Sequence, residues 1–399
     1  MKIFDRKLWR NFDYILMLII VLLVLFGSIF ILNSETDTFT GNETSFMEIW
    51  SRLDFTYVRL HLTWFGIGIF LMLIVSVIDY HALSELSKYL YIFIILLLVY
   101  VLVTDKKING TAGWITFGSS SDRAVQPAEF AKLVIILICA KFAAQSSEIS
   151  SSPSFTTVMT ILGVAGVPIL LIFLQPDNGT AFVCILIVLA MLFMSGLDYK
   201  YLIIGGVLIV GAIVVLFLLD KLPSFIKMRF YDFFGLEFFG LEEYPEDVKH
   251  LISNNLTTAF NSIKAGGWSG LGLFSPTSNA KMGYLFGHST DFVFASGVEA
   301  VGFVGGLAII ILYLCMMFRM LYLSHKAKDK LGSFIIIGVV AFEFAHIFEN
   351  IGMNIGLMPV TGIPLPFISY GGSHMWANML AIGMVQSVAM RRSSRRYDK

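Results

Sequence analysis

Charged residues are scarce in this chain. Only 14% of its 399 residues are Asp, Glu, Lys or Arg, whereas about a quarter is usual in water-soluble domains. Hydrophobic residues make up 57% and the mean hydropathy is +0.79, so the apolar content exceeds what one soluble core could use. This composition excludes a secreted or cytosolic enzyme and indicates a membrane protein.

Net charge and a cysteine framework are also lacking. The 28 Lys and Arg residues balance 28 Asp and Glu residues, which removes the basic surface expected of a nucleic-acid binder. Cys139, Cys184 and Cys315 lie in apolar runs without CxxC spacing, so we expect neither disulfides nor a zinc site. We interpret all three as small buried hydrophobic residues.

Uncharged runs of bilayer-crossing length are abundant. They predict an all-α polytopic membrane protein with about ten transmembrane helices. The first run is too long for a signal-peptide core and lacks a typical cleavage site, so we expect it to be retained. No internal repeat or linker divides the chain, which predicts a single domain over residues 1–399. The runs are residues 14–32, 60–78, 89–103, 128–144, 156–174, 180–196, 201–219, 292–318, 334–358 and 375–390.

The distribution of Lys and Arg predicts the orientation. Basic residues gather before the first run, between the eighth and ninth runs, and after the tenth, and such residues favour cytoplasmic loops. Both termini are therefore expected in the cytoplasm. A long loop, residues 220–290, is expected outside the cell between helices 7 and 8. Its mixture of phenylalanines and charges favours amphipathic helices at the membrane surface; a solvated loop is the alternative.

Ionisable side chains inside a span cost about 2.5–3.5 kcal/mol each, so each needs a reason to be there. Glu129 and Lys132 stand three residues apart after Pro127, a favourable first helical residue, and can pair within the bilayer. The pair is either structural or part of a functional cavity. Asp177, in a tight external turn, can cap the following helix, and this structural interpretation is favoured.

Two further constellations carry ionisable groups. Asp291 stands where the long loop enters a helix, as a cap or as a catalytic base. Glu299 lies about two turns deeper and is expected to face the bundle. Glu343, His346 and Asn350 share one helical face. We expect them to face the interior, and interhelical packing or hydrogen bonding is favoured over a proton relay for His346.

Residues 359–373 contain three prolines among hydrogen-bonding side chains, which excludes a continuous helix. Irregular backbone at membrane depth is tolerated only where protein or a water-lined cavity satisfies its polar groups. The segment therefore predicts a re-entrant turn beside a site, with a rigid plug as the alternative.

The run 350–373 closely resembles the signature of the SEDS family (shape, elongation, division and sporulation), which includes RodA and FtsW. Segments 109–115, 126–132, 175–180 and 290–299 agree in the same order, so the resemblance spans almost the whole chain. Residues 352–359 look closer to RodA than to FtsW. Three departures stand out: His288 is displaced from the family position, Gly113 replaces a basic residue, and Ala300 replaces a glutamate.

The resemblance implies a peptidoglycan glycosyltransferase that polymerises lipid II on the outer face of the bacterial cytoplasmic membrane. It implies that Asp291 is the essential acidic residue, and we predict that it acts as the catalytic base in an inverting reaction. It also matches Trp114, Glu129 and Lys132 to positions near a central cavity. The expected substrate-binding residues are Trp114, Glu129, Lys132, Asp177, Glu299 and Ser369.

Partners and cofactors follow from the same reaction. Lys132, Arg123 and a divalent cation, Mg²⁺ or Mn²⁺, are candidates to balance the leaving diphosphate, although the sequence has no dedicated metal cage; no organic cofactor is expected. The resemblance implies a class B penicillin-binding protein as partner, besides lipid II and membrane lipids. The glycines at 302, 305 and 306 either receive that partner's helix or pack within the bundle.

Two other function classes remain open. A flippase or transporter of a lipid-linked precursor would also line its path with ionisable residues, but no inverted repeat is found. A noncatalytic scaffold for a penicillin-binding protein would make Asp291 dispensable.

Overall fold

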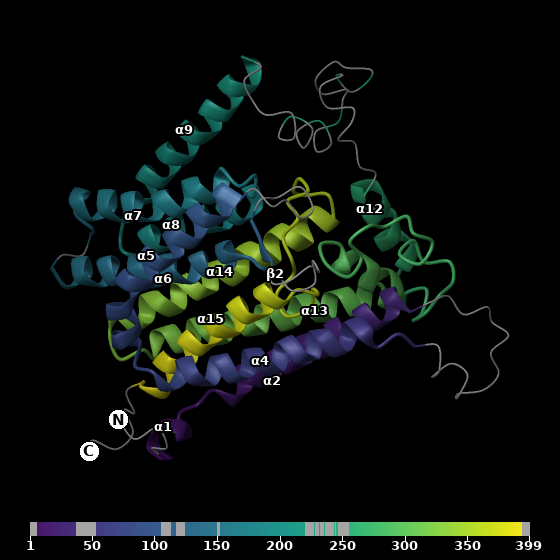
Figure 1. Ribbon diagram of the computed structural model, residues 1–399, viewed down its shortest axis with the longest axis horizontal. Coiled ribbons are helices and arrows are strands. Elements are labelled where there is room, and N and C mark those ends of the chain that lie inside the picture. Colours follow the sequence, from purple (N-terminus) through teal and green to yellow (C-terminus); the bar gives the residue numbers. More distant parts are fainter. Residues whose placement is uncertain are drawn as a thin grey trace.

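The computed structural model describes residues 6–36, 53–104, 113–116, 124–149, 152–219 and 255–392, with five single positions between 227 and 245. This part of the chain is mostly helical (Figure 1). Most of segment 220–254, including the phenylalanines that predicted amphipathic helices, lies outside the described residues.

Long helices occur at each of the ten predicted runs, which confirms the all-α class. They are α2 (Tyr14–Glu35), α4 (Thr56–Val77), α5 (Tyr80–Thr104), α6 (Pro127–Ile149), α7 (Phe155–Phe173), α8 (Asn178–Met194), α9 (Tyr199–Leu218), α13 (Val293–His325), α14 (Lys330–Asn354) and α15 (Gly372–Met390). Within the described residues, six of them (α2, α4, α5, α7, α13 and α14) are long and apolar enough to cross a membrane. The protein is therefore a multi-pass membrane protein.

Short elements complete the described chain. Helix α1 (Arg6–Arg10) precedes α2, and α12 (Asn255–Gly266) precedes α13. Strands β1 (Ile115–Thr116) and β2 (Ala124–Val125) pair antiparallel, with Ile115 opposite Val125. Because β2 runs directly into α6, this small hairpin lies over the N-terminal end of that helix.

Helix α14 forms the centre of the bundle. It packs against α6, α8, α13 and α15, and 67% of its most apolar stretch is buried inside the protein, against 22–44% for the other five candidate spans. Around it, α4 lies along α15 and α2 lies along α13, whereas α9 projects away and packs on α8 (Figure 1). Polar residues on α14 are thus shielded from lipid by other helices.

The two described ends of the chain meet at one end of the bundle. Asp13 caps α2 through the Leu16 N–H and accepts a forked pair of hydrogen bonds from Arg319 of α13. Its backbone N–H donates to the Gln386 side chain of α15 at 2.9 Å, and the Asn11 amide donates to the Met390 carbonyl. The start of α2 and the end of α15 therefore lie on the same side.

Helix α13 differs from the continuous helix that the sequence predicted. It breaks at Gly302, where φ is 73° and ψ is −176°. Segment 267–272 packs into the break: the Phe303 N–H donates to the Gly267 carbonyl at 2.8 Å, and the Leu271 N–H donates to the Glu299 carbonyl at 2.9 Å. This segment supplies hydrogen bonds that the helix loses at the break.

Two of the glycines on α13 lie against other residues of this chain, whereas docking of a partner's helix at this surface stays a prediction. A Cβ at Gly302 would come within 2.3 Å of the Gly270 nitrogen, and one at Gly306 within 2.8 Å of Val298. Gly302 and Gly306 therefore permit packing within the protein. One cysteine interpretation needs correction: Cys139 and Cys184 are buried, but Cys315 is exposed, because it lies on the outward face of α13, between exposed Ile311 and Phe318.

Candidate active site

Asp291 lies just before α13, where the preceding loop enters the helix. The N-cap residue of α13 is Phe292, and no side chain caps the helix. Asp291 therefore does not cap α13, which was one of its two predicted roles. The partly buried carboxyl group faces Gly362, where an added Cβ would lie 3.6 Å from Oδ2. Desolvation raises the pKa of Asp291 from 3.8 to about 6.

Two asparagines of α14 hold the backbone of Asp291. The side-chain amides of Asn350 and Asn354 both donate to the Asp291 carbonyl, at 2.9 and 3.1 Å. Asn350 also donates to the Ile363 carbonyl at 2.7 Å, and the Asn354 side-chain oxygen accepts from the Ala295 N–H. The central helix thus fixes Asp291 relative to both α13 and the irregular segment 355–371.

Ser369 fastens this irregular segment to the same loop. Its hydroxyl donates to the Thr290 carbonyl at 2.6 Å and accepts from the Leu365 N–H at 2.8 Å. The next residue, Tyr370, donates its N–H to the Ser289 carbonyl. The predicted irregular backbone is confirmed, and protein groups satisfy part of it next to Asp291; a re-entrant position in the membrane stays a prediction.

A second cluster lies at the start of α6. Asp177 caps α8 by accepting the Thr180 N–H, as predicted, and accepts the Gln126 side-chain amide at 2.7 Å. The Gln126 N–H donates to Ser373 at 3.1 Å. Burial raises the pKa of Asp177. Trp114 is partly buried directly before β1, so the hairpin brings it to the same end of α6.

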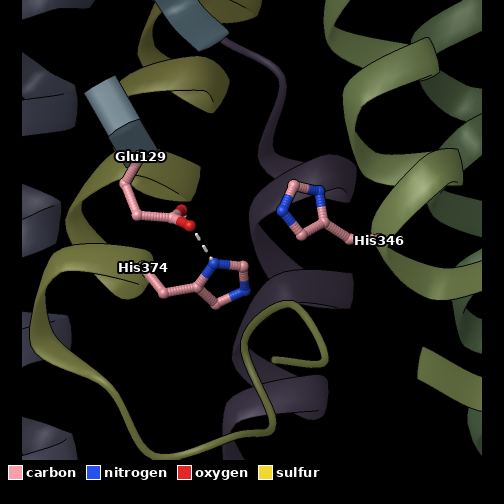
Figure 2. Close-up of side chains that lie close together, drawn as sticks. All are labelled: Glu129, His346 and His374. Carbon is pink, nitrogen blue, oxygen red and sulfur yellow. Dashed lines mark hydrogen bonds and ion pairs between the residues drawn. The ribbon is translucent and has the colours of Figure 1, made fainter. Parts of the chain in front are cut away.

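Further along α6, Glu129 and Lys132 form the predicted ion pair, with 2.7 Å between Nζ and Oε1. The side chains are buried, with exposures of 3% for Glu129 and 0% for Lys132. The Lys132 ammonium is also 2.9 Å from His346 Nε2, and His374 Nδ1 is 3.0 Å from Glu129 Oε2. Figure 2 shows Glu129, His346 and His374 pointing towards one another. The interior orientation predicted for Glu343, His346 and Asn350 is confirmed, since all three are fully buried.

Glu299 does not face the bundle, which corrects the prediction. Its carboxylate accepts hydrogen bonds from Ser278 at 2.8 Å and from both nitrogens of Asn279 at 3.0 and 2.9 Å. It is fully buried between α13 and the preceding loop, which also packs against the break at Gly302. Glu299 anchors that loop, and a contact with substrate stays a prediction.

His288 lies beside Glu35 at the end of α2, with 3.8 Å between Nδ1 and Oε1. Burial lowers the pKa of His288. Its backbone carbonyl accepts the Ser296 hydroxyl at 2.8 Å. His288 thus contacts the end of α2 and the first turn of α13.

Sequence reasoning missed three residues that the fold brings to the site: Gln126, Asn354 and His374. The signal for His374 was available, because an imidazole in the first turn of an apolar helix is costly without a partner. The links made by Gln126 and Asn354 depend on contacts between distant elements, which local spacing does not encode.

The described residues contain one candidate group for a metal ion. In this part of the chain, the one group of three His, Cys, Asp or Glu residues near enough to share a metal ion is Glu129, His346 and His374. Mg²⁺ prefers oxygen ligands, so this nitrogen-rich group does not suit it. Arg123, the other expected partner of the diphosphate, lies outside the described residues.

Comparison with known proteins places these features in a family. The family model described as "Cell cycle protein", which covers FtsW, RodA and SpoVE, matches residues 13–394. The chain belongs to this family. The SEDS proteins most similar to it include stage V sporulation protein E of Bacillus subtilis, 30% identical over 384 residues, with 94% of this chain and 96% of that protein covered.

Two other relatives bear an enzyme name. "Peptidoglycan glycosyltransferase RodA" of Treponema pallidum is 29% identical, with 96% of this chain and 98% of that protein covered. "Peptidoglycan glycosyltransferase MrdB" of Escherichia coli K12 is 30% identical, with coverages of 82% and 84%.

Solved structures of other proteins have a similar fold. A chain of a complex described as "Structural coordination of polymerization and crosslinking by a peptidoglycan synthase complex" has a TM-score of 0.73 and 25% identity, with 96% of this chain and 99% of that chain covered. Thermus thermophilus RodA, at 23% identity and a TM-score of 0.65 with coverages of 96% and 97%, shares the fold.

Proposed function

We propose that this SEDS protein, a peptidoglycan glycosyltransferase like its named relatives, polymerises lipid II at the outer face of the bacterial cytoplasmic membrane. One observation supports Asp291 as the catalytic residue. The Asp291 carboxyl group is desolvated, while the asparagines of α14 hold its backbone. A carboxylate that is fixed in position and raised in pKa is suited to general-base chemistry.

In the proposed reaction, Asp291 takes the proton from the C4 hydroxyl of the acceptor sugar. The hydroxyl oxygen attacks the anomeric carbon of the second lipid II, and the bond to undecaprenyl pyrophosphate breaks. An α-linked donor and a β-linked product imply one displacement with inversion. Because a pKa of about 6 lies closer to neutral pH than 3.8 does, Asp291 is a stronger base than a free aspartate.

The other predicted substrate contacts surround this position. Trp114, Asp177 and Ser369 lie in elements that meet at the outer ends of α6, α8 and α15, and we propose that they line the sugar or diphosphate path. Lys132 is engaged by Glu129 and His346, so a contact with the diphosphate would require it to exchange one of these partners. A divalent cation at the diphosphate is part of the proposal.

The orientation and the partner belong to the same proposal. Ten spans with both termini in the cytoplasm would put Asp291, Trp114 and Ser369 outside, where lipid II is polymerised. The meeting of α2 and α15 at one end of the bundle supports an even number of spans. We propose a class B penicillin-binding protein as partner, supported by the likeness to a chain of a peptidoglycan synthase complex.

The decisive experiment replaces Asp291 with Asn, which keeps its size but removes the base. We expect lipid II polymerisation by the purified protein to fall by about 10²-fold or more, with an unchanged elution profile on size exclusion. Asp198→Asn, at an exposed acidic residue before α9, is the matched control and should retain activity. Wild-type turnover by Asp291→Asn would contradict the catalytic assignment.

The same preparation tests the alternatives. A scaffold would yield no glycan from purified wild-type protein, whatever residue stands at 291. A transporter would move labelled lipid II across proteoliposomes without forming polymer.

A further inference from the structure

Helix α13 folds back on itself at its break. A Cβ added at Gly306 would lie 2.8 Å from the Val298 side chain and 3.7 Å from the Phe294 ring. These two residues precede Gly306 by 8 and 12 positions, which a straight helix would separate by about 12 and 18 Å along its axis. The parts of α13 before and after Gly302 are therefore two arms that pack against each other.

The fold-back brings Tyr313 to the same side of the bend as Asp291. Each of these residues stands 11 positions from Gly302, Asp291 before it and Tyr313 after it. Tyr313 is only 1% exposed, and its hydroxyl donates to the Pro366 carbonyl at 2.5 Å. A buried tyrosine hydroxyl requires an acceptor, and here the irregular segment between α14 and α15 supplies it.

The Pro366 carbonyl belongs to a tight turn, Leu365–Ile368, that has an unusual residue in its third position. The Ile368 N–H donates to the Leu365 carbonyl at 3.3 Å, and Phe367 has a φ of 63°. Proline in the second position and a positive φ in the third are features of a type II turn, in which the third residue is usually glycine or asparagine. Phe367 is fully buried, so its ring packs in the core while its backbone adopts a conformation that is rare for a bulky residue.

Tyr313 holds the turn in this form. The Pro366 carbonyl is part of the central peptide of the turn, and a flip of that peptide would give a type I turn, in which Phe367 has a negative φ. The flip would also take the carbonyl away from Tyr313 and leave a buried hydroxyl without an acceptor, which is unfavourable. Helix α2 packs on the same turn, because a Cβ at Gly27 would lie 2.6 Å from the Ile368 carbonyl oxygen.

The turn leads directly into the residues that hold the loop before Asp291. The Ser369 hydroxyl donates to the Thr290 carbonyl at 2.6 Å, and the Tyr370 N–H donates to the Ser289 carbonyl at 2.9 Å. Both carbonyls belong to residues immediately before Asp291. A change in the turn would therefore reach Asp291 through two hydrogen bonds.

We propose that Tyr313 is a positioning residue for Asp291. Its hydroxyl keeps the Leu365–Ile368 turn in the type II form, and the turn fixes the backbone that carries Asp291. Tyr313 acts through the turn and does not contact the substrate. The proposal rests on the proposed role of Asp291 as the catalytic base.

The first test replaces Tyr313 with Phe in full-length protein in lipid nanodiscs, which keeps the ring and removes the hydroxyl. We expect kcat for lipid II polymerisation to fall by about tenfold or more with little change in KM. The pH profile should keep its shape because the base is retained. The matched control is Tyr91→Phe, since the Tyr91 hydroxyl of α5 also donates to a backbone carbonyl, that of Val164 in α7, at 2.8 Å. Equal kcat values for the two variants would overturn the proposal.

The second test measures amide hydrogen exchange by mass spectrometry in the same nanodiscs, without lipid II. Tyr313→Phe should speed exchange in segment 365–371 and in segment 287–292, whereas Tyr91→Phe should change neither. Wild-type exchange at 287–292 in Tyr313→Phe would overturn the link to Asp291. Because this measurement uses no substrate, it separates failure of the positioning role from failure of the proposed polymerase activity.

Gly27→Ala keeps the proposal falsifiable if Tyr313→Phe does not fold. The added methyl group would press on the Ile368 carbonyl from α2 while every hydrogen-bonding side chain stays in place. We expect the same fall in kcat and the same faster exchange at 287–292. Gly66→Ala on α4 is the control, because a Cβ there has nothing within 4 Å, and it should behave as wild type. Wild-type kcat and exchange in Gly27→Ala would overturn the role of the turn.

Discussion

Asp291 and Glu129 are carboxylates at the same end of the bundle, but they have different surroundings. Glu129 has a lysine and a histidine within 3.0 Å, which stabilise its charge. Asp291 has no such cation within the hydrogen-bonded part of the described site, and desolvation raises its pKa to about 6. At the residue scale, the difference separates a structural carboxylate from a candidate base.

The raised pKa of Asp291 predicts a pH dependence of stability. The folded protein holds this proton more tightly than the unfolded chain does. The resulting stabilisation is fully present below about pH 3.8 and is lost as the pH rises through about 6. In Asp291→Asn this dependence should disappear, so the variant should be relatively more stable than wild type at pH 7 than at pH 5. Thermal unfolding across this range measures the difference, and parallel curves for the two proteins would contradict it.

The Glu129–Lys132 pair allows a double-variant test. Removing one partner leaves a buried charge unpaired, which typically costs about 3–5 kcal/mol, so Glu129→Gln and Lys132→Met should each lower thermal stability. The double variant should recover much of it. If Lys132 also contacts the diphosphate, the double variant should be stable yet inactive in lipid II polymerisation. Restored activity would remove Lys132 from the substrate-binding residues.

At the scale of elements, α14 connects Asp291 to the buried cluster of Glu129, Lys132 and His374. Asn354, Asn350, His346 and Glu343 follow one another at intervals of three or four residues, so they form a single stripe. Its outer part holds Asp291 and its inner part holds Lys132. Because other helices surround α14, this stripe is possible in a membrane protein without exposing polar groups to lipid.

This arrangement predicts that Asn350 positions Asp291. Asn350→Leu keeps a similar volume but leaves the Asp291 and Ile363 carbonyls without this donor, at a cost of about 1–3 kcal/mol. Displacement of the base should lower kcat by about tenfold or more with little change in KM, and the pH profile should keep its shape because the base is retained. Asn378→Leu removes a buried amide that bonds its own helix and controls for stability. Equal kcat values for the two variants would argue against positioning.

The sequence predicted the helices well and the break in α13 poorly. Apolar runs set the length of each helix, so α2, α4–α9 and α13–α15 occur at the ten predicted places. The break at Gly302 depends on segment 267–272, whose N–H and C=O groups replace those of the helix. Glycine alone at that position is compatible with a continuous helix, and nothing local indicates the inserted loop. The contacts of Glu299 with Ser278 and Asn279 were missed for the same reason.

At the scale of the whole molecule, the cost of burying charge explains which site residues could be foreseen. Asp291, Glu129 and Lys132 are conspicuous because ionisable groups are rare in apolar sequence. His374 and Gln126 acquire partners only when α15 and β2 meet the start of α6. The bundle also collects the irregular segment and the external loop at the end opposite to the contacts of Asp13 with Arg319 and Gln386, so the molecule has two chemically different ends.

This polarity predicts the orientation in the membrane. Lys and Arg residues precede α2 and follow α15 in the sequence. The end of the bundle at which these two helices meet should therefore be cytoplasmic. Ser278 is buried against Glu299, but neighbouring Thr277 is exposed on the external loop, and Lys328 is exposed between α13 and α14. In a cysteine-free background, Thr277→Cys should react with a membrane-impermeant maleimide in intact cells. Lys328→Cys should react only after the membrane is permeabilised. Labelling of Lys328→Cys alone in intact cells would reverse the orientation and place Asp291 on the wrong side for the proposed reaction.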